Sequence, residues 1–286
     1  MQTLDQLNRQ FGIPNTVRFE TGNGGLVRAV ISNPHAEVHV YLYGAHVTHY
    51  QPHGQKPVLF LSRKAYFIPG KPIRGGVPVC FPWFGNKEDD PQAAMHGTVR
   101  LREWDVESAS ADRLVLRTDE APFEVRHIIT VRDSLTMALE VRNTGKETAR
   151  FEEALHTYFA VSDVRNVAIA GLAGAGYLDK TEGFKRKREG DGLMRLTQEP
   201  DRLYLNTKTT CIVDDPGWQR KIVVEKQNSD STVVWNPWEK RAAALPDFAP
   251  EEWPGMLCIE TVNARENAVT LPAGKTHTMT ATVRLV

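Results

Sequence analysis

Three observations predict an all-β fold for this chain. Segments in which apolar and polar residues alternate recur along most of the sequence, and this alternation is typical of half-buried strands. Stretches with the periodicity of a long amphipathic helix are hard to find. Two alternating runs, 123–131 and 135–141, lie on either side of Asp133-Ser134 and predict a hairpin. So many strands imply packed sheets or a large sandwich.

The same alternation predicts the other strands, which cover residues 26–31, 36–42, 114–118, 149–159, 222–226, 256–262 and 277–285. Two long segments, 67–90 and 171–200, do not alternate and are predicted to be functional or mobile loops. The second contains the basic run 185–188, which we interpret as a solvated loop face. Repeats, low-complexity tracts and linkers are not evident, so we expect a single domain over residues 1–286.

Charge and cysteine content narrow the range of partners and compartments. Lys plus Arg total 35 and Asp plus Glu total 35, so no overall charge favours nucleic acid or an anionic membrane. Any bound anion must therefore be held by a few placed residues. The 3 cysteines are widely spaced and form no Cys-x-x-Cys pair, which argues against a disulfide framework or a structural zinc site. With no apolar span and a polar start, we expect a cytoplasmic protein, and we expect it to be a monomer.

His156 is the first candidate for acid–base chemistry. In the strand predicted over 149–159, Phe151, Leu155 and Phe159 share one face, which leaves His156 on the other face among polar and aromatic groups. Histidine is a natural acid or base near neutral pH. The alternative is an exposed or purely structural histidine.

Glu260 is the second candidate. It lies in the run Met256 to Val262, which is largely apolar on both faces. A carboxylate is costly to bury in such a strand unless it is paired, and the loss of water would raise its pKa toward a value useful for a general base. The alternatives are a structural salt bridge or a strand end that reaches water.

Two arginines are candidates for binding an anion or sugar oxygens. Arg74 immediately precedes Gly75-Gly76, where backbone can approach closely, and Arg100 follows His96-Gly97. Taken alone, any one arginine is more often a surface group than a ligand. A nucleotide phosphate loop, a serine nucleophile elbow and a dense His/Asp metal cluster are not found, so no metal site is predicted.

Several uncommon strings occur in a characteristic order, namely GAHV (44–47), IRGGVPVCFPWFG (73–85), HG (96–97), LHTYFAVSD (155–163), DRLYLN (201–206), WNPW (235–238) and CIETVNA (258–264). In these strings the chain resembles the glucose-6-phosphate 1-epimerase branch of the aldose 1-epimerase superfamily. The resemblance covers nearly the whole chain. It implies a large antiparallel β-sandwich of the galactose mutarotase type, in agreement with the alternation.

The resemblance also implies a reaction. Glu260 would be the base that takes the proton from the anomeric O1 hydroxyl, and His156 would be the acid that protonates the ring oxygen. The ring then opens, the C1–C2 bond rotates, and closure gives the other anomer. Two proton transfers and positioning carry this reaction, so no metal or organic cofactor is expected.

The same resemblance assigns substrate contacts. Asp201 would accept hydrogen bonds from ring hydroxyls, and Arg74 and Arg100 would meet a phosphate or ring oxygen in the pocket. His96 resembles a second histidine that free-sugar mutarotases hold near the substrate, and a structural or orienting role is an equal alternative.

The resemblance favours a hexose 6-phosphate as the substrate, with glucose 6-phosphate first. Where many members read HGFAR, this chain has Thr98 and Val99, and Met95 stands where some relatives have a polar contact. The preferred hexose phosphate is therefore left open. Two alternatives remain: a mutarotase for unphosphorylated aldoses, and a carbohydrate-binding protein without turnover. The presence of both His156 and Glu260 speaks against the second.

Overall fold

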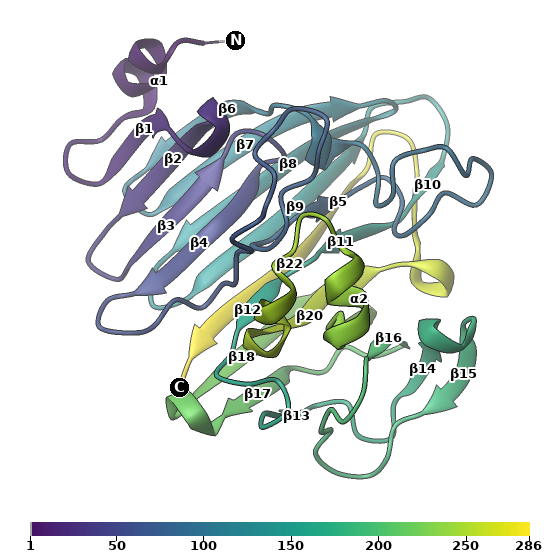
Figure 1. Ribbon diagram of the computed structural model, residues 1–286. Helices are drawn as coiled ribbons and strands as arrows, with labels where there is room; N and C mark the ends of the chain where they lie inside the picture. Colours follow the sequence, from purple (N-terminus) through teal and green to yellow (C-terminus); the bar gives the residue numbers. More distant parts are fainter. Residues whose placement is uncertain (1) are drawn as a thin grey trace.

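The computed structural model describes residues 2–286, and most of its strands belong to two large antiparallel sheets (Figure 1). We call the first the cleft sheet, because it carries the candidate site. Its order is β15 (Lys185–Arg188), β14 (Gly176–Asp179), β16 (Asp201–Leu205), β19 (Ser231–Trp235), β20 (Met256–Asn263), β11 (Glu153–Leu155) and β5 (Val79–Cys80), and β12 (Tyr158–Ala160) also pairs with β20.

The second sheet, which we call the long sheet, contains the longest strands. Its order is β13 (Ala168–Ala170), β17 (Cys211–Asp215), β18 (Arg220–Gln227), β22 (Thr276–Leu285), β9 (Leu135–Asn143), β8 (Phe123–Val131), β7 (Arg113–Glu120) and β6 (Asp105–Ser110). The hairpin predicted from the alternation is confirmed, because β8 and β9 pair from Val131 opposite Leu135 to Phe123 opposite Asn143.

Smaller elements complete the fold. The N-terminal sheet comprises β1 (Val17–Thr21), β2 (Val27–Ser32), β3 (Ala36–Tyr41) and β4 (His46–Pro52), and β10 (Ala149–Phe151) pairs with β21 (Val269–Leu271). The α-helices are α1 (Leu4–Phe11) and α2 (Trp238–Ala244), and the short 3-10 turns are η1 (Asn23–Gly25), η2 (Val99–Leu101), η3 (Lys180–Glu182), η4 (Pro216–Trp218), η5 (Pro250–Gly255) and η6 (Arg265–Asn267). Within residues 2–286, none of the helices has the length and apolar content needed to cross a membrane. The all-β prediction is confirmed.

The two faces of the cleft sheet belong to different apolar clusters. Leu155, Phe159 and Ile259 are buried in the main core, together with side chains of the long sheet and the N-terminal sheet. Their sequence neighbours Tyr158 and Cys258 lie in a second cluster, as expected for strands whose successive side chains point to opposite faces. Each fully buried Leu, Ile or Phe of the main core contributes about 1.5–3 kcal/mol. The main core therefore fixes one face of this sheet and leaves the other for the site.

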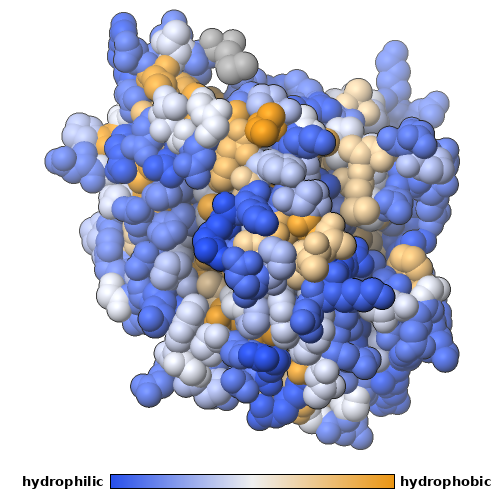
Figure 2. All heavy atoms as spheres, viewed as in Figure 1, coloured by the Kyte–Doolittle hydropathy of each residue, from blue (hydrophilic) through white to orange (hydrophobic). Residues whose placement is uncertain are grey.

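The surface follows the expected pattern for a protein with balanced charge. Figure 2 shows mainly hydrophilic residues on the face in view, with the hydrophobic ones in small groups between them. The large hydrophobic side chains that are exposed in the described residues are Ile68, Met95, Phe184, Leu193 and Val286.

The prediction of one continuous strand over 149–159 is wrong in one respect. The segment forms three short strands, β10, β11 and β12, with breaks at Glu152 and at His156-Thr157. Glu152 leaves the ladder because its carboxylate accepts hydrogen bonds from the backbone N–H groups of Phe84 and Arg265. Local alternation could not show this, because both partners are distant in the sequence.

The prediction of a loop over 171–200 is also corrected. The segment contains the hairpin of β14 and β15, and the basic run Lys185–Arg188 is the exposed edge strand β15. Four basic residues give no alternation, because both faces of this edge strand are largely solvated, and charged side chains are common on sheet edges. The segment 67–90 does remain irregular, apart from the two-residue strand β5.

Candidate active site

The pairing register of the cleft sheet places His156 opposite Glu260. Leu155 of β11 pairs with Thr261 of β20, and Tyr158 of β12 pairs with Cys258. The count of residues between these pairs puts His156 against Glu260, and directly opposite residues of antiparallel strands project from the same face.

At the break between β11 and β12, the Gly- and Pro-rich segment before β5 supplies the missing hydrogen-bond acceptors. The backbone N–H of His156 donates to the carbonyl of Pro78 at 3.0 Å, and that of Tyr158 donates to Gly76 at 2.9 Å. The segment containing Gly76 and Pro78 therefore runs beside the histidine and brings Arg74 to the same place. The backbone N–H groups of His156, Thr157 and Tyr158 at the break all remain paired, so they can be buried without loss of their hydrogen bonds.

The same register extends the site across the sheet. Val233 pairs with Glu260, Trp235 pairs with Cys258, and Asp201 pairs with Trp235. Of these side chains, Glu260, Trp235 and Asp201 line the floor of a cleft of about 670 Å³. All six residues predicted from the sequence line this cleft: Arg74, His96, Arg100, His156, Asp201 and Glu260.

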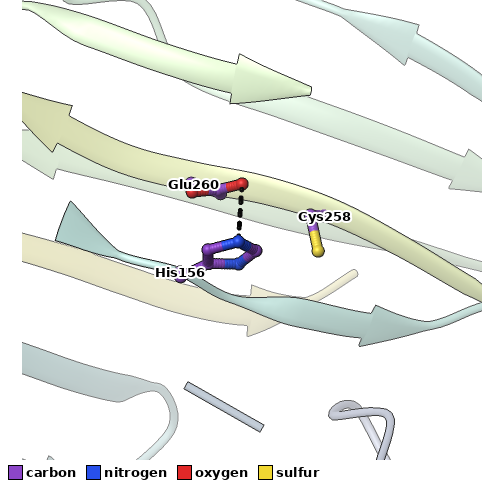
Figure 3. A group of neighbouring side chains, drawn as sticks. All are labelled: His156, Cys258 and Glu260. Carbon is purple, nitrogen blue, oxygen red and sulfur yellow. Dashed lines mark ion pairs between the residues drawn. The ribbon is translucent and has the colours of Figure 1, made fainter. Parts of the chain in front are cut away.

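His156 and Glu260 form a buried pair at the cleft floor. The Nε2 atom of His156 lies 3.3 Å from Oε1 of Glu260, and Figure 3 shows the ring and the carboxylate facing each other, with Cys258 beside them. Within residues 2–286, the other polar atoms of the pair, Nδ1 of His156 and Oε2 of Glu260, have no hydrogen-bond partner. A pair with two free buried polar atoms in a cleft is poised to contact a polar ligand.

The surroundings shift the two pKa values in opposite directions. Burial raises the pKa of Glu260 well above its usual value, with Lys180 opposing this and Asp201 adding to it. Burial lowers the pKa of His156 well below its usual value, and the charges of Arg100, Arg74 and Lys180 lower it further. These opposite shifts favour a single proton on the pair, since removing it or adding a second would create a buried net charge.

His96 is held as a neutral hydrogen-bond donor. The backbone N–H of Gly85 donates to its Nδ1 at 3.1 Å, so the ring proton must be on Nε2. Burial and the charge of Arg100 lower the pKa of His96 well below its usual value. Its ring meets the His156 ring at 5.5 Å in an edge-to-face arrangement. A Cβ on Gly97 would come 1.9 Å from the Phe81 carbonyl, so this glycine permits the close approach that fixes the loop.

The two arginines differ in how their charge is balanced. Arg74 lies 3.1 Å from Asp247 and donates from Nη1 to the Tyr158 hydroxyl at 3.1 Å. Burial disfavours its charge, but Tyr158 and Asp247 outweigh burial and raise the pKa of Arg74.

Arg100 has no carboxylate partner within residues 2–286. It donates from Nη2 to the Met95 carbonyl at 2.6 Å, and its buried Nε has no partner. Burial lowers the pKa of Arg100 below its usual value. Arg100 is therefore the cation of this cleft that most needs an external anion.

Asp201 lies in a small ionic cluster on the far side of the floor. Its carboxylate is 2.7 Å from the ammonium of Lys180 and 3.9 Å from the guanidinium of Arg241. The β14–β16 register explains the first contact, because Asp179 pairs with Arg202 and the next pair along is Lys180 with Asp201.

Comparisons with known proteins agree with this arrangement. The family model for aldose 1-epimerase matches residues 28–284. The chain belongs to the aldose 1-epimerase family. A protein of Cenchrus ciliaris that carries the provisional name glucose-6-phosphate 1-epimerase is 34% identical over 259 residues, covering 82% of this chain and 77% of the relative. An Escherichia coli protein with the same provisional name is 32% identical over 249 residues, covering 83% of each.

A solved structure from Salmonella typhimurium, titled provisionally as a mutarotase, has the same fold. It superimposes with a TM-score of 0.87 at 26% identity and covers 96% of this chain and 95% of its own. A galactose mutarotase related enzyme from Lactobacillus acidophilus also shares the fold, with a TM-score of 0.73 at 15% identity over 91% of this chain and 97% of its own, so the prediction of a large antiparallel fold of the galactose mutarotase type is confirmed.

Sequence reasoning missed Lys180 in this aldose 1-epimerase-family cleft. The residue follows β14 in a segment that we predicted to be a loop, and its side chain reaches the floor only through the pairing of β14 with β16. Lys180 influences the pKa of both Glu260 and His156. Only the register of the β14–β16 pair places Lys180 at the cleft, and the local sequence pattern did not reveal that register.

One group of possible metal ligands coincides with the pair. His156, Cys258 and Glu260 place their donor atoms within 4.8 Å of one another. Burial and the charge of Glu260 raise the pKa of the Cys258 thiol well above its usual value, so the thiol keeps its proton. A protonated thiol is a poor metal ligand, and two remaining donors are fewer than zinc sites use. The chemistry of this donor set fits proton transfer better than metal binding.

Proposed function

We propose that this chain is a mutarotase that interconverts the α and β anomers of hexose 6-phosphates, with glucose 6-phosphate as the first candidate. The names of the Cenchrus ciliaris and Escherichia coli relatives support this reaction. The observation that carries the proposal is the combination of a one-proton pair, His156 and Glu260, with the unbalanced cation of Arg100 in one cleft.

In the proposed mechanism, the pair holds one proton before and after each step. At the start of ring opening, His156 is an imidazolium and Glu260 is a carboxylate. Glu260 takes the proton from the O1 hydroxyl, His156 gives its proton to the ring oxygen, and the C1–O5 bond breaks to leave the aldehyde. After rotation about C1–C2, the aldehyde re-forms the ring with the proton transfers reversed. Each transfer of this type contributes about 10²–10⁴-fold in rate.

The remaining cleft residues are proposed to hold the sugar phosphate. Arg100 would bind the phosphate, because a charge-assisted hydrogen bond to an anion satisfies its free donor. Arg74 would contact the phosphate or a ring oxygen while remaining on Asp247. His96 would donate from Nε2 to a ring hydroxyl, and Asp201 would accept from one.

Compartment is part of the same proposal. We expect the enzyme to act in the cytoplasm, a view supported by the three free, buried cysteines Cys80, Cys211 and Cys258. Cysteines that remain unpaired are typical of a reducing environment.

Exchange NMR at the anomeric carbon tests the function directly. Wild-type protein should accelerate the α/β exchange of glucose 6-phosphate above the uncatalysed rate, and more strongly than that of glucose or galactose at equal concentration. The uncatalysed exchange of each sugar is subtracted. No acceleration on glucose 6-phosphate together with clear turnover of a free aldose would contradict the phosphate assignment and favour the unphosphorylated alternative.

A further inference from the structure

Three of the cations that line the cleft, Arg74, Arg100 and Lys180, lower the pKa of His156, and their charges are balanced unequally. Arg74 pairs with Asp247, and Lys180 pairs with Asp201. Arg100 contacts only a backbone carbonyl and keeps a buried Nε without a partner within residues 2–286. An anion that enters this cleft therefore binds most favourably at Arg100.

The charge of Arg100 acts on one member of the acid–base pair and not on the other. Apart from burial, Arg100 has the largest influence on the pKa of His156. The charges that shift the pKa of Glu260 are those of Lys180 and Asp201. Neutralising Arg100 therefore favours the imidazolium form of His156 while changing Glu260 much less.

The other groups packed against His156 do not change their charge near pH 7, so they do not alter its protonation. The Tyr158 ring stacks on it at 4.8 Å, the His96 ring lies at 5.5 Å, and the Trp235 ring lies at 6.0 Å. Burial raises the pKa of Tyr158 and of Cys258 and lowers the pKa of His96, so all three stay neutral near pH 7. The charge on His156 thus depends on Glu260, on the three cations and on any anion bound to them.

We propose that the phosphate group of the substrate is an activator of the chemical step. Bound at Arg100, it promotes the protonation of His156, which is the form of the residue that can donate a proton to the ring oxygen. This inference rests on the proposed function and concerns how that same site distinguishes phosphorylated from free sugars. Specificity for the phosphorylated sugar is then expressed in kcat as well as in KM.

The proton balance explains why such an activator is useful. Ring opening starts with the proton on His156, and ring closure starts with the proton on Glu260. In the free cleft, burial of the pair and the charges of Arg100 and Arg74 at His156 favour the uncharged form, in which Glu260 holds the proton. A dianion at Arg100 brings the two forms closer in free energy without adding or removing a proton, so both directions of the reaction proceed with a small penalty.

The test separates the phosphate from the sugar. D-xylose lacks C6 and leaves room for a free anion, so its anomeric exchange is measured by NMR with wild-type protein and increasing inorganic phosphite. We expect saturable activation of about tenfold, which corresponds to one pKa unit at His156. The acidic limb of the pH–rate profile should also move to higher pH when phosphite is bound. Exchange catalysed by the buffer alone is measured without protein and subtracted.

Variants assign the effect to Arg100. Arg100→Met should abolish the activation by phosphite, whereas Arg100→Lys, which keeps the charge, should retain part of it. Arg102→Met is the matched control, because Arg102 pairs with Glu120 and does not line the cleft. Equal activation of Arg100→Met and wild type would overturn the assignment to Arg100.

The outcomes distinguish this inference from the proposed function. If wild-type protein turns over glucose 6-phosphate but phosphite leaves xylose exchange unchanged or inhibits it, the activation is refuted and the proposed function stands. If wild-type protein does not accelerate glucose 6-phosphate exchange at all, the proposed function fails first, and the phosphate has no catalytic role to play.

Discussion

The substitution Glu260→Gln tests the acid–base pair with the smallest change in shape. Glu260 is buried, and its Oε1 lies 3.3 Å from Nε2 of His156. A glutamine amide at this distance can hydrogen-bond to neutral His156, and no unpaired charge is left behind. The free energy of unfolding should therefore change by about 1 kcal/mol or less. Without a proton acceptor, turnover should fall by about 10²–10⁴-fold, which is about 2.7–5.4 kcal/mol in the activation barrier.

The assay combines exchange NMR on glucose 6-phosphate with urea unfolding of the same samples. Glu153→Gln is the control, because Glu153 is equally buried but lies outside the cleft, where it accepts hydrogen bonds from Asn263 and His277. This control should lower stability and preserve turnover of the folded protein. A folded Glu260→Gln protein whose turnover stays within about threefold of wild type would refute Glu260 as the base.

Four further predictions follow from the same structure. His156→Asn should lose about 10²–10⁴-fold in turnover, and its pH–rate profile should lose the acidic limb that the imidazole gives the wild type; an unchanged rate would move the acid elsewhere, with His96 next. On glucose 6-phosphate, Arg100→Ala should raise KM more than Arg74→Ala does, because Asp247 already balances Arg74; equal effects in steady-state kinetics would contradict this. Burial disfavours the charge of His277, but its contact with Glu153 outweighs burial and raises the pKa of His277, so the stabilisation is full below pH about 6.5 and is lost as pH rises through the folded value. His277→Asn should therefore destabilise more at pH about 5.5 than at pH about 8.5 in urea unfolding, and an equal loss at both would argue against an ionic contribution. Phe159→Ala should cost about 3–5 kcal/mol by the same measurement, because the side chain is buried in the main core; a loss below about 1 kcal/mol would show that the core collapses around the gap.

Much of the fold could be predicted from local pattern. The hairpin of β8 and β9 is an example: burial of one face requires apolar residues at every second position, and both strands carry them except at His127 and at the terminal Asn143. Prediction failed where other forces override that pattern. Glu152 interrupts a strand to accept distant backbone hydrogen bonds, and the basic strand β15 lies on an edge where neither face is fully buried.

The candidate site also has features that local sequence predicts and features that only the tertiary structure shows. The sequence by itself determined that His156 stands apart from the apolar row of its segment and that Glu260 lies in an apolar strand, since both are properties of residues close in the chain. Only the tertiary structure decided that the two face each other, because strand register joins residues that are about a hundred positions apart.

The partners that balance the cations of the cleft could not be predicted from local pattern for the same reason. Arg74 and Arg100 are equivalent candidates in the sequence, yet in the fold one meets Asp247 and the other meets no carboxylate within residues 2–286. Lys180 gave no signal until β14 paired with β16. Hydrophobic periodicity is a local consequence of burial on one face, whereas the field in a cleft is a sum over charges that chain folding brings together.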